Sequence, residues 1–422
     1  MARRRPERVR SCGTGSPPLH IAIVIERFAP SNGFSPNAGT APSASTVPSA
    51  GGVENAAWQV ARELCRQGER VTVVARAFDE AAYASLPADQ RPERIVLRVP
   101  TAWQPTRVLA FSRAAARATR DARFDLVHGF ARTRHQDLYR AGGGSHADYL
   151  HHMYGPGGRA LRALSPRHRV LQAIEGAVFR DPRQWIQCAS RLVSRALIER
   201  HGVDPARIHL LPNGVDVARH RSAAADGESL RRRWLDRDPS AERLWLLPGS
   251  GWRRKGLAVA LDAIERLADP GLRLLVAGRD DPGPWQSRVA RRGLTGKIQF
   301  LGPRGDLPAL YHAVDGVVLP TRYDAFANVT LEAAASGTPI VTTATNGAAE
   351  WLGEGILIVD DPDDAEAFAT ALASLRDDAT RRRRGEAAAR AALPLDWSNH
   401  VKSLRRLYTA RLERSEAGTA PR

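Results

Sequence analysis

Two carboxylates, Asp324 and Glu332, stand eight residues apart near the end of the chain. Asp324 follows the apolar run 316–320, which is predicted to be a buried parallel strand, and Glu332 lies in the Ala- and Leu-rich stretch 328–336, which is predicted to be helical. The helix should begin at the carboxyl end of a strand, where open α/β sheets bind ligands. The N–H groups of its first turn suit a phosphate, and Glu332, about one turn further on, suits a ribose diol.

An ordinary explanation of this pair stays open when it is taken alone. A carboxylate just before a helix stabilises the positive end of the helix dipole, and a Glu in the next turn can simply face solvent. A second group of residues is therefore needed to decide between a ligand site and a surface helix.

That second group is the loop 249–256, which follows a predicted strand and opens a predicted helix. It has neither the Walker A spacing nor the G-x-G-x-x-G pattern. Gly249 and Gly251 would let the backbone approach a ligand, and Arg254 and Lys255 bring two cations to a helix N-terminus, which suits a diphosphate. Only three of the 62 basic residues are lysines, so Lys255 in this loop is informative. A surface turn with solvated cations is the alternative, but the nearby carboxylates favour a nucleoside-diphosphate site.

Length and composition limit the classes of protein to consider. A chain of 422 residues suggests two or three domains, and no apolar run approaches the roughly 20 residues of a membrane span. The basic N-terminus is not followed by the apolar stretch of a secretory signal. The three cysteines, Cys12, Cys65 and Cys188, are scattered, which fits a reducing cytoplasm and predicts neither a disulfide framework nor a zinc site.

The formal net charge is +17, and the arginines are spread along the whole chain. The resulting positive field favours phosphorylated substrates, anionic lipid surfaces or nucleic acid. A nucleic-acid site would interleave basic and aromatic residues on one face, which this spread does not suggest. The run 381–384, four consecutive arginines, is expected on a solvated helix face.

The order of predicted elements gives two α/β domains. Strands are expected at 20–25, 70–75, 94–99 and 124–128, with a helix at 54–67, and a second series at 244–247, 272–277, 298–301, 316–319, 339–343 and 356–359. We divide the chain into a basic flexible N-terminus (1–19), a first Rossmann-like domain (20–215) with a flexible loop (31–50), a second Rossmann-like domain (216–395), a C-terminal helix packing back on the first domain (396–412) and a flexible tail (413–422).

Four motifs in order resemble those of family 4 of the retaining, GT-B-fold glycosyltransferases. They are Gly51-Gly52-Val53-Glu54, Leu211-Pro212-Asn213-Gly214-Val215-Asp216, Arg253-Arg254-Lys255-Gly256 and Asp324-x7-Glu332. Two positions depart from the family pattern, since Asp324 stands for the usual Glu and Ala327 for the usual glycine. Within the family, the segments 25–30 and 137–146 are similar to transferases that add sugar to the lipopolysaccharide core.

This resemblance implies an α/β fold of the GT-B type, with two doubly wound parallel-sheet domains facing a central cleft. It implies a hexosyltransferase-type enzyme that moves a sugar, with retention, from a UDP-sugar to a glycan or glycolipid acceptor such as lipopolysaccharide core. The first domain would hold the acceptor and the second the donor. No metal, other cofactor or nucleic acid is expected. A cytoplasmic location is expected, with peripheral contact to an anionic surface on the cytoplasmic face of the inner membrane.

The resemblance also assigns roles to residues of this sequence. The catalytic group would be Asp324, Lys255 and Arg254; donor binding would involve Gly52, Arg219, Gly251, Phe326, Ala327, Asn328, Val329 and Glu332; the acceptor candidates are Asp137 and His146.

Two other functions remain as alternatives at this point. A nucleotide-sugar epimerase of the same two-domain fold would bind the same donor without transferring its sugar. A basic nucleic-acid-binding protein is the other alternative, suggested by the net charge alone.

Overall fold

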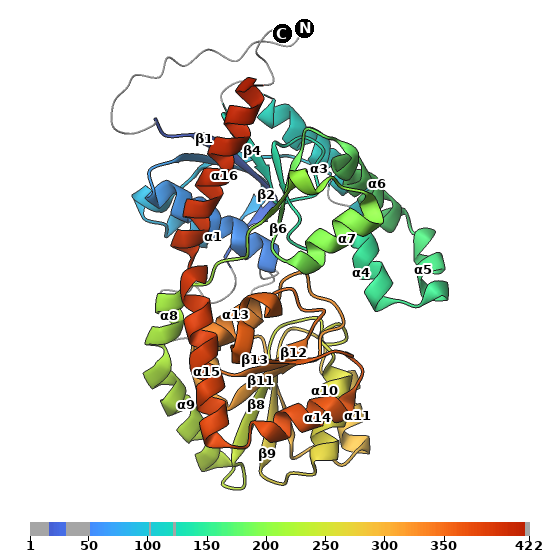
Figure 1. Ribbon diagram of the computed structural model, residues 1–422, viewed down its shortest axis with the longest axis vertical. Helices are drawn as coiled ribbons and strands as arrows, with labels where there is room; N and C mark the ends of the chain where they lie inside the picture. The colour runs from blue at the N-terminus through green and yellow to red at the C-terminus, as the bar shows by residue number, and fades with distance from the viewer. Residues whose placement is uncertain (1–16, 31–50, 101–102, 121–123, 418–422) are drawn as a thin grey trace.

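The computed structural model describes residues 17–30, 51–100, 103–120 and 124–417 of the chain (Figure 1). The predicted flexible loop 31–50 lies outside the described residues, as do residues 1–16 and 418–422 of the predicted flexible ends.

The first domain is a seven-stranded parallel sheet in the order β3-β2-β1-β4-β5-β6-β7. Its strands are β1 (His20–Phe28), β2 (Arg70–Phe78), β3 (Glu93–Val96), β4 (Leu126–Gly129), β5 (Leu138–Arg140), β6 (Trp185–Cys188) and β7 (Ile208–Leu210). Its helices are α1 (Gly52–Arg66), α2 (Glu80–Ala84), α3 (Gln104–Thr119), α4 (His146–Met153), α5 (Pro156–Ala163), α6 (Pro166–Arg180) and α7 (Arg191–His201). The first six residues of β1 are all buried, as expected for a parallel strand covered on both faces.

The second domain is a six-stranded parallel sheet in the order β10-β9-β8-β11-β12-β13. Its strands are β8 (Arg243–Leu247), β9 (Leu272–Ala277), β10 (Ile298–Gly302), β11 (Gly316–Leu319), β12 (Ile340–Thr343) and β13 (Ile356–Val359). Its helices are α8 (Val217–Ser222), α9 (Ala224–Arg237), α10 (Leu257–Leu267), α11 (Gly283–Arg291), α12 (Leu307–Ala313), α13 (Asn328–Ala335), α14 (Ala365–Ser374) and α15 (Asp378–Ala392). Both strand orders are doubly wound, which confirms the predicted fold class.

The chain passes between the domains twice, and the two crossings are held together. The N–H of Val215 donates to the carbonyl of Leu395 at 2.8 Å. A Cβ on Gly214 would lie 2.5 Å from the Trp397 ring, so a glycine is required for this close approach. Helix α16 (Trp397–Ala417) then runs back along the first domain (Figure 1), and it continues five residues beyond the predicted end at 412.

Helix α16 is fastened to the first domain by apolar and polar contacts. Trp397, Val401, Leu404 and Tyr408 are buried in the same apolar cluster as the interior of β1 and α1. Arg405 also forms an ion pair with the buried Glu69 at 2.6 Å.

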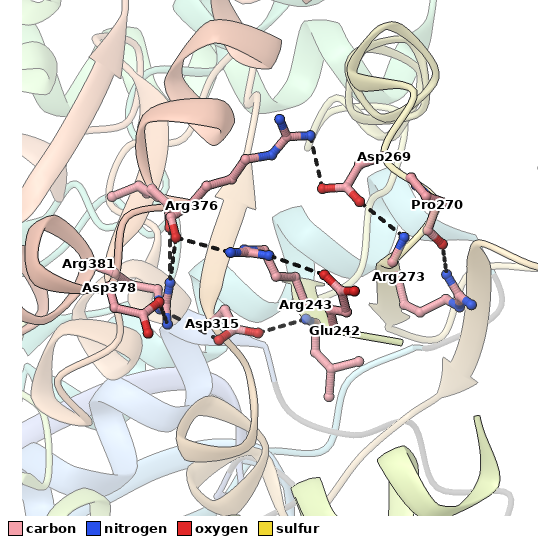
Figure 2. A network of polar contacts seen from close by, with 12 residues as sticks. Glu242, Arg243, Asp269, Pro270, Arg273, Asp315, Arg376, Asp378 and Arg381 are labelled. Atoms are coloured by element: carbon pink, nitrogen blue, oxygen red, sulfur yellow. Dashed lines mark hydrogen bonds and ion pairs between the residues drawn. The ribbon is translucent and has the colours of Figure 1, made fainter. Parts of the chain in front are cut away.

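The four consecutive arginines do not all face solvent, contrary to the prediction. Arg381 forms ion pairs with Asp378 at 2.7 Å and with the buried Asp315 at 3.5 Å, in the network that Figure 2 shows. Arg384 donates to the carbonyl of Glu354 at 2.9 Å, and the other two arginines of the run are exposed. Half of this run therefore stabilises the second domain, because its helix turns two of the four side chains inward.

In the part of the chain that the structure describes, no helix combines the length and the apolar character that crossing a bilayer requires.

Candidate functional site

The candidate site lies where the strand order of the second domain reverses, between β8 and β11. The loop 249–256 follows β8 and the segment holding Asp324 follows β11, so both emerge at the carboxyl edge of neighbouring strands. Ligands of doubly wound sheets bind at this switch point. The two motifs that the sequence singled out are therefore neighbours, although some 70 residues separate Arg254 from Asp324.

An ion-pair cluster forms the centre of the site. Nη1 of Arg254 donates to Oδ2 of Asp324 at 2.5 Å and to the carbonyl of Tyr323 at 3.0 Å. Nζ of Lys255 lies 3.6 Å from the same carboxylate oxygen, with only 6% of its side chain exposed. One carboxylate thus orders both predicted cations.

The glycines hold the cationic loop in place. Gly251 has φ +86° and Gly256 has φ +76°, which L side chains rarely adopt, and a Cβ on Gly256 would lie 1.9 Å from the Pro320 carbonyl oxygen. The carboxylate of Asp280 accepts from the N–H of Gly251 at 2.8 Å and from that of Trp252 at 3.0 Å. Gly251 was predicted to bind the donor, but its N–H is already paired within the protein, so this glycine acts through the shape of the loop.

Burial and charge shift the pKa values of the cluster. Burial, only partly offset by Asp324, lowers the pKa of Lys255 to about 8. Burial alone would raise the pKa of Asp324, but the charges of Arg254 and Lys255 outweigh it and keep that pKa below its ordinary value. At neutral pH the cluster carries two positive charges and one negative charge, so it attracts an anion.

Helix α13 begins beside this cluster. Its preceding residue, Ala327, donates its N–H to Oδ1 of Asn346 at 3.3 Å, so this N–H is already paired, contrary to the prediction that it would hold a ligand. Asn328 and Val329 form the first turn, whose N–H groups lack partners within the helix. Phe326 is buried in the apolar core of the second domain, which anchors the segment.

Glu332 lies one turn into α13. It accepts from the hydroxyl of Tyr311 at 3.1 Å, and its burial raises its pKa, although Arg219 and Lys255 act in the opposite direction. Arg219 is thereby placed near this carboxylate from α8, which directly follows the motif 211–216. The structure therefore brings Arg219, Lys255 and Glu332 to one region.

The first domain reaches the site through Gly52. This residue is the first of α1, and its neighbour Gly51 donates its N–H to the Glu54 carboxylate at 3.1 Å, which fixes the start of the helix. A Cβ on Gly52 would lie 3.0 Å from Nδ2 of Asn328. The N-termini of α1 and α13 thus meet across the two domains, and both present positive dipole ends.

His146, predicted to face the acceptor, begins α4. Its Nε2 lies 2.7 Å from Nδ1 of His168, and its own N–H donates to Glu175 at 2.8 Å. Burial lowers the pKa of His146 to about 4, so the ring is neutral at pH 7. The same helix reaches the candidate site further on, because the His152 ring stacks on the Tyr323 ring at 4.9 Å.

Asp137 is not at the site. It precedes β5, at the amino-terminal edge of the sheet, and its carboxylate accepts from the N–H of Val127 at 2.9 Å and pairs with Arg411 at 3.8 Å. Because the strands are parallel, this edge lies opposite the one that carries the ligand loops. This position corrects the prediction that Asp137 faces the acceptor.

Sequence reasoning missed three residues that shape the site. Asn346 accepts from two N–H groups and donates to Thr330 and Thr342, so it holds the segment before α13. Ser190 donates to the carbonyl of Ala325 at 2.8 Å across the domains. Asn213 donates to Asn328 at 2.8 Å, and only this residue lay in a motif that the sequence had singled out.

Comparison with known families gives two matches. Residues 50–219 match the model described as Glycosyltransferase Family 4, and residues 242–378 match the model described as Glycosyl transferases group 1.

Curated relatives match over part of their length. A glycogen synthase of Mycobacterium tuberculosis is 32% identical over 262 residues, 60% of this chain and 60% of that protein. A D-inositol 3-phosphate glycosyltransferase of Salinispora tropica is 32% identical over 254 residues, 53% of this chain and 52% of that protein. The chain therefore spans about half to three fifths of the length of these relatives.

Solved structures share the whole fold. WaaG, a glycosyltransferase involved in lipopolysaccharide biosynthesis, superposes with a TM-score of 0.74 at 20% identity, over 92% of this chain and 99% of that chain. Anabaena Alr3699/HepE in complex with UDP-glucose gives a TM-score of 0.68 at 17% identity, over 93% and 100%. The chain therefore has the GT-B fold of these structures, and the two family matches show that it consists of glycosyltransferase domains, family 4 over residues 50–219 and group 1 over residues 242–378.

Proposed function

We propose that this protein transfers a sugar, with retained anomeric configuration, from a UDP-sugar to a glycan or glycolipid acceptor. The observation that carries the proposal is the meeting of Arg254, Lys255 and the N-termini of α1 and α13 at the switch point of the second sheet. Two cations and two helix N-termini suit a diphosphate. The UDP-glucose complex of the similarly folded HepE supports a UDP-sugar as the donor class.

The proposed chemistry depends on stabilising the leaving group. As the bond between the anomeric carbon and the diphosphate breaks, negative charge grows on the departing phosphate, and Arg254 and Lys255 offset it. The departing phosphate oxygen takes the proton of the acceptor hydroxyl, which forms the new bond on the same face of the sugar. In this proposal the cations do the work of a metal ion, and Glu332 holds the ribose hydroxyls.

The acceptor is proposed to be a glycan or glycolipid, with lipopolysaccharide core as the first candidate. The fold shared with WaaG supports this choice, whereas the curated relatives are named for other products. His146 and the surrounding polar side chains of α4 and α6 are the proposed acceptor side.

We also propose peripheral contact with anionic lipid through α5 and the start of α6, in a cytoplasmic protein. Helix α5 stands at the edge of the first domain (Figure 1), and Leu161 and Leu164 are 68% and 75% exposed. Residues 149–174 contain four arginines and neither Asp nor Glu, so charge favours an anionic surface. The free thiol forms of Cys65 and Cys188 fit a reducing compartment.

Two experiments test these proposals. A panel of UDP-sugars is incubated with and without lipopolysaccharide core oligosaccharide, with EDTA present, and products are identified by mass spectrometry and NMR of the new anomeric centre. Transfer with retention supports the proposal, and conversion of the sugar without acceptor would instead support an epimerase.

Co-sedimentation with phosphatidylglycerol vesicles tests the lipid contact. The bound fraction should fall for the Leu161→Ser, Leu164→Ser double variant, and no binding of the wild type at low salt would refute the contact.

A further inference from the structure

Three side chains form a polar chain from the interior of the first domain to the candidate site: Arg140 and Asn213 are buried, and Asn328 is half-buried. Nη2 of Arg140, at the carboxyl end of β5, donates to Oδ1 of Asn213 at 2.5 Å. Nδ2 of Asn213, in the first crossing between the domains, donates to Oδ1 of Asn328 at 2.8 Å. Nδ2 of Asn328 then lies on the side of Gly52, 3.0 Å from where a Cβ on that glycine would be.

Arg140 fixes the direction of every hydrogen bond in this chain. A guanidinium only donates, so Asn213 must present its oxygen to Arg140 and its NH₂ group to Asn328. Asn328 must in turn present its oxygen to Asn213, which directs its own NH₂ group toward Gly52. The chain therefore ends in a hydrogen-bond donor at the point where the two helix N-termini meet.

The charge of Arg140 has no counter-ion among the described residues. None of the ion pairs among the described residues includes Arg140, although only 3% of the residue is exposed to solvent. Its Nη1 has no hydrogen-bond partner, and burial lowers its pKa to about 10, so it stays protonated at neutral pH. Burying a charge without a partner is costly unless polar neighbours compensate, and the amide of Asn213 is the neighbour that does so.

Local backbone makes room for this arginine. A Cβ on Gly142 would lie 1.9 Å from Nη1 of Arg140, so the glycine after β5 is needed for the guanidinium to lie where it does. The ring of Phe130 lies 5.3 Å from the guanidinium carbon and covers another side. Because hydrogen bonds in a chain polarise one another, the charge of Arg140 strengthens the donor at the far end.

We propose that the side-chain amide of Asn328 donates to the diphosphate of the sugar nucleotide, and that Arg140, acting through Asn213, is a positioning residue that orients and strengthens this donor. This inference rests on the proposed function and adds to it a side-chain contact beyond the backbone of α13. It also gives a role to an arginine that is buried without an acidic partner at the end of β5.

The sharpest variant is Asn213→Asp. A carboxylate accepts from Arg140 and provides the missing counter-ion, so the variant should unfold at the same or a higher temperature than the wild type. Its second oxygen can only accept, so Asn328 must turn its NH₂ group toward position 213 and away from Gly52. We expect UDP affinity, measured by titration calorimetry, to fall by about tenfold to a hundredfold, the range for a hydrogen bond to a charged group.

A double-mutant cycle tests the path through Asn328. Asn328→Ala and Arg140→Met should each weaken UDP binding by about tenfold or more, and Arg140→Met should add little in the Asn328→Ala background. Arg140→Lys, which keeps a charged donor, should bind UDP more tightly than Arg140→Met. Asn399→Asp, an exposed position on α16, adds the same charge as Asn213→Asp and serves as the matched control, with affinity unchanged.

The outcomes separate the inference from the proposed function. If the wild type binds UDP and transfers sugar while Asn213→Asp binds UDP as tightly as the wild type, the inference is refuted and the function stands. A destabilised Asn213→Asp variant, or additive losses in the cycle, would also refute it by showing a structural role only. If the wild type neither binds UDP nor transfers sugar from any donor, the proposed function itself fails.

Discussion

The carboxylate of Asp324 lies 2.5 Å from Nη1 of Arg254, so the protein itself holds the Arg254 guanidinium in place. Burial of both side chains, which are 15% and 27% exposed, keeps this pair from being fully screened by solvent. The ion pair orders the Arg254 guanidinium, but the negative charge of Asp324 also repels an incoming diphosphate. Asp324 should therefore matter more for the geometry of transfer than for nucleotide affinity.

Asp324→Asn is expected to separate these two effects. The amide keeps the shape of the side chain but releases Arg254 and Lys255, so sugar transfer should fall on the order of a hundredfold while UDP still binds. Steady-state kinetics and titration calorimetry provide the two readouts. Asp324→Glu, which restores the residue usual in the family, should transfer faster than Asp324→Asn, and equal rates would show that the charge has no role.

The lowered pKa of Lys255 predicts a pH dependence of donor binding. The amine is charged below pH about 8 and neutral above it, so the affinity for UDP should decrease as pH rises from 7 to 9. The decrease approaches about tenfold per unit if only the charged form binds. Lys255→Arg, whose side chain stays protonated, should bind with little change over this range, and the same slope in both proteins would contradict the assignment.

Glu332 is expected to recognise the ribose. Glu332→Gln removes the charge of the proposed acceptor for the ribose hydroxyls and should weaken UDP binding by about tenfold. A 2′,3′-dideoxy analogue of UDP, which lacks those hydroxyls, should bind the variant and the wild type equally. Calorimetry with both ligands makes this comparison, and an equal loss for both would place Glu332 in a structural role, through its bond with Tyr311 at 3.1 Å.

Gly144 is predicted to control how closely the two domains pack. Its φ is +69°, and a Cβ there would lie 2.0 Å from the hydroxyl of Tyr323, the residue before Asp324. Gly144→Ala should therefore push the domains apart, which lowers the rate of transfer and raises the radius of gyration in small-angle scattering. Gly143→Ala is the matched control, because a Cβ there meets nothing within 4 Å, and it should behave as the wild type.

The second domain could be predicted closely because its signals are local. Strand β11 is an uninterrupted apolar run, β9 is apolar except for Arg273, and the helix predicted to follow the loop 249–256 is α10. Strands β5, β6 and β7 were not predicted, since each has only three or four residues and two of them carry buried polar side chains, Arg140 and Gln187. Their place in the sheet comes from pairing with neighbours distant in the sequence.

The sequence by itself determined the choice of candidate residues, because glycines, cations and carboxylates at strand ends form patterns within a few residues of one another. Lys255, Arg254, Asp324 and Glu332 could be selected in this way. Only the tertiary structure decided which of these side chains meet. It placed Asp137 at the edge of the sheet opposite the ligand loops, and it paired the Ala327 N–H with Asn346. It also joined Arg140 to Asn328 through Asn213. These contacts join segments that lie far apart in the chain, and folding alone sets the distances and directions on which hydrogen bonds depend.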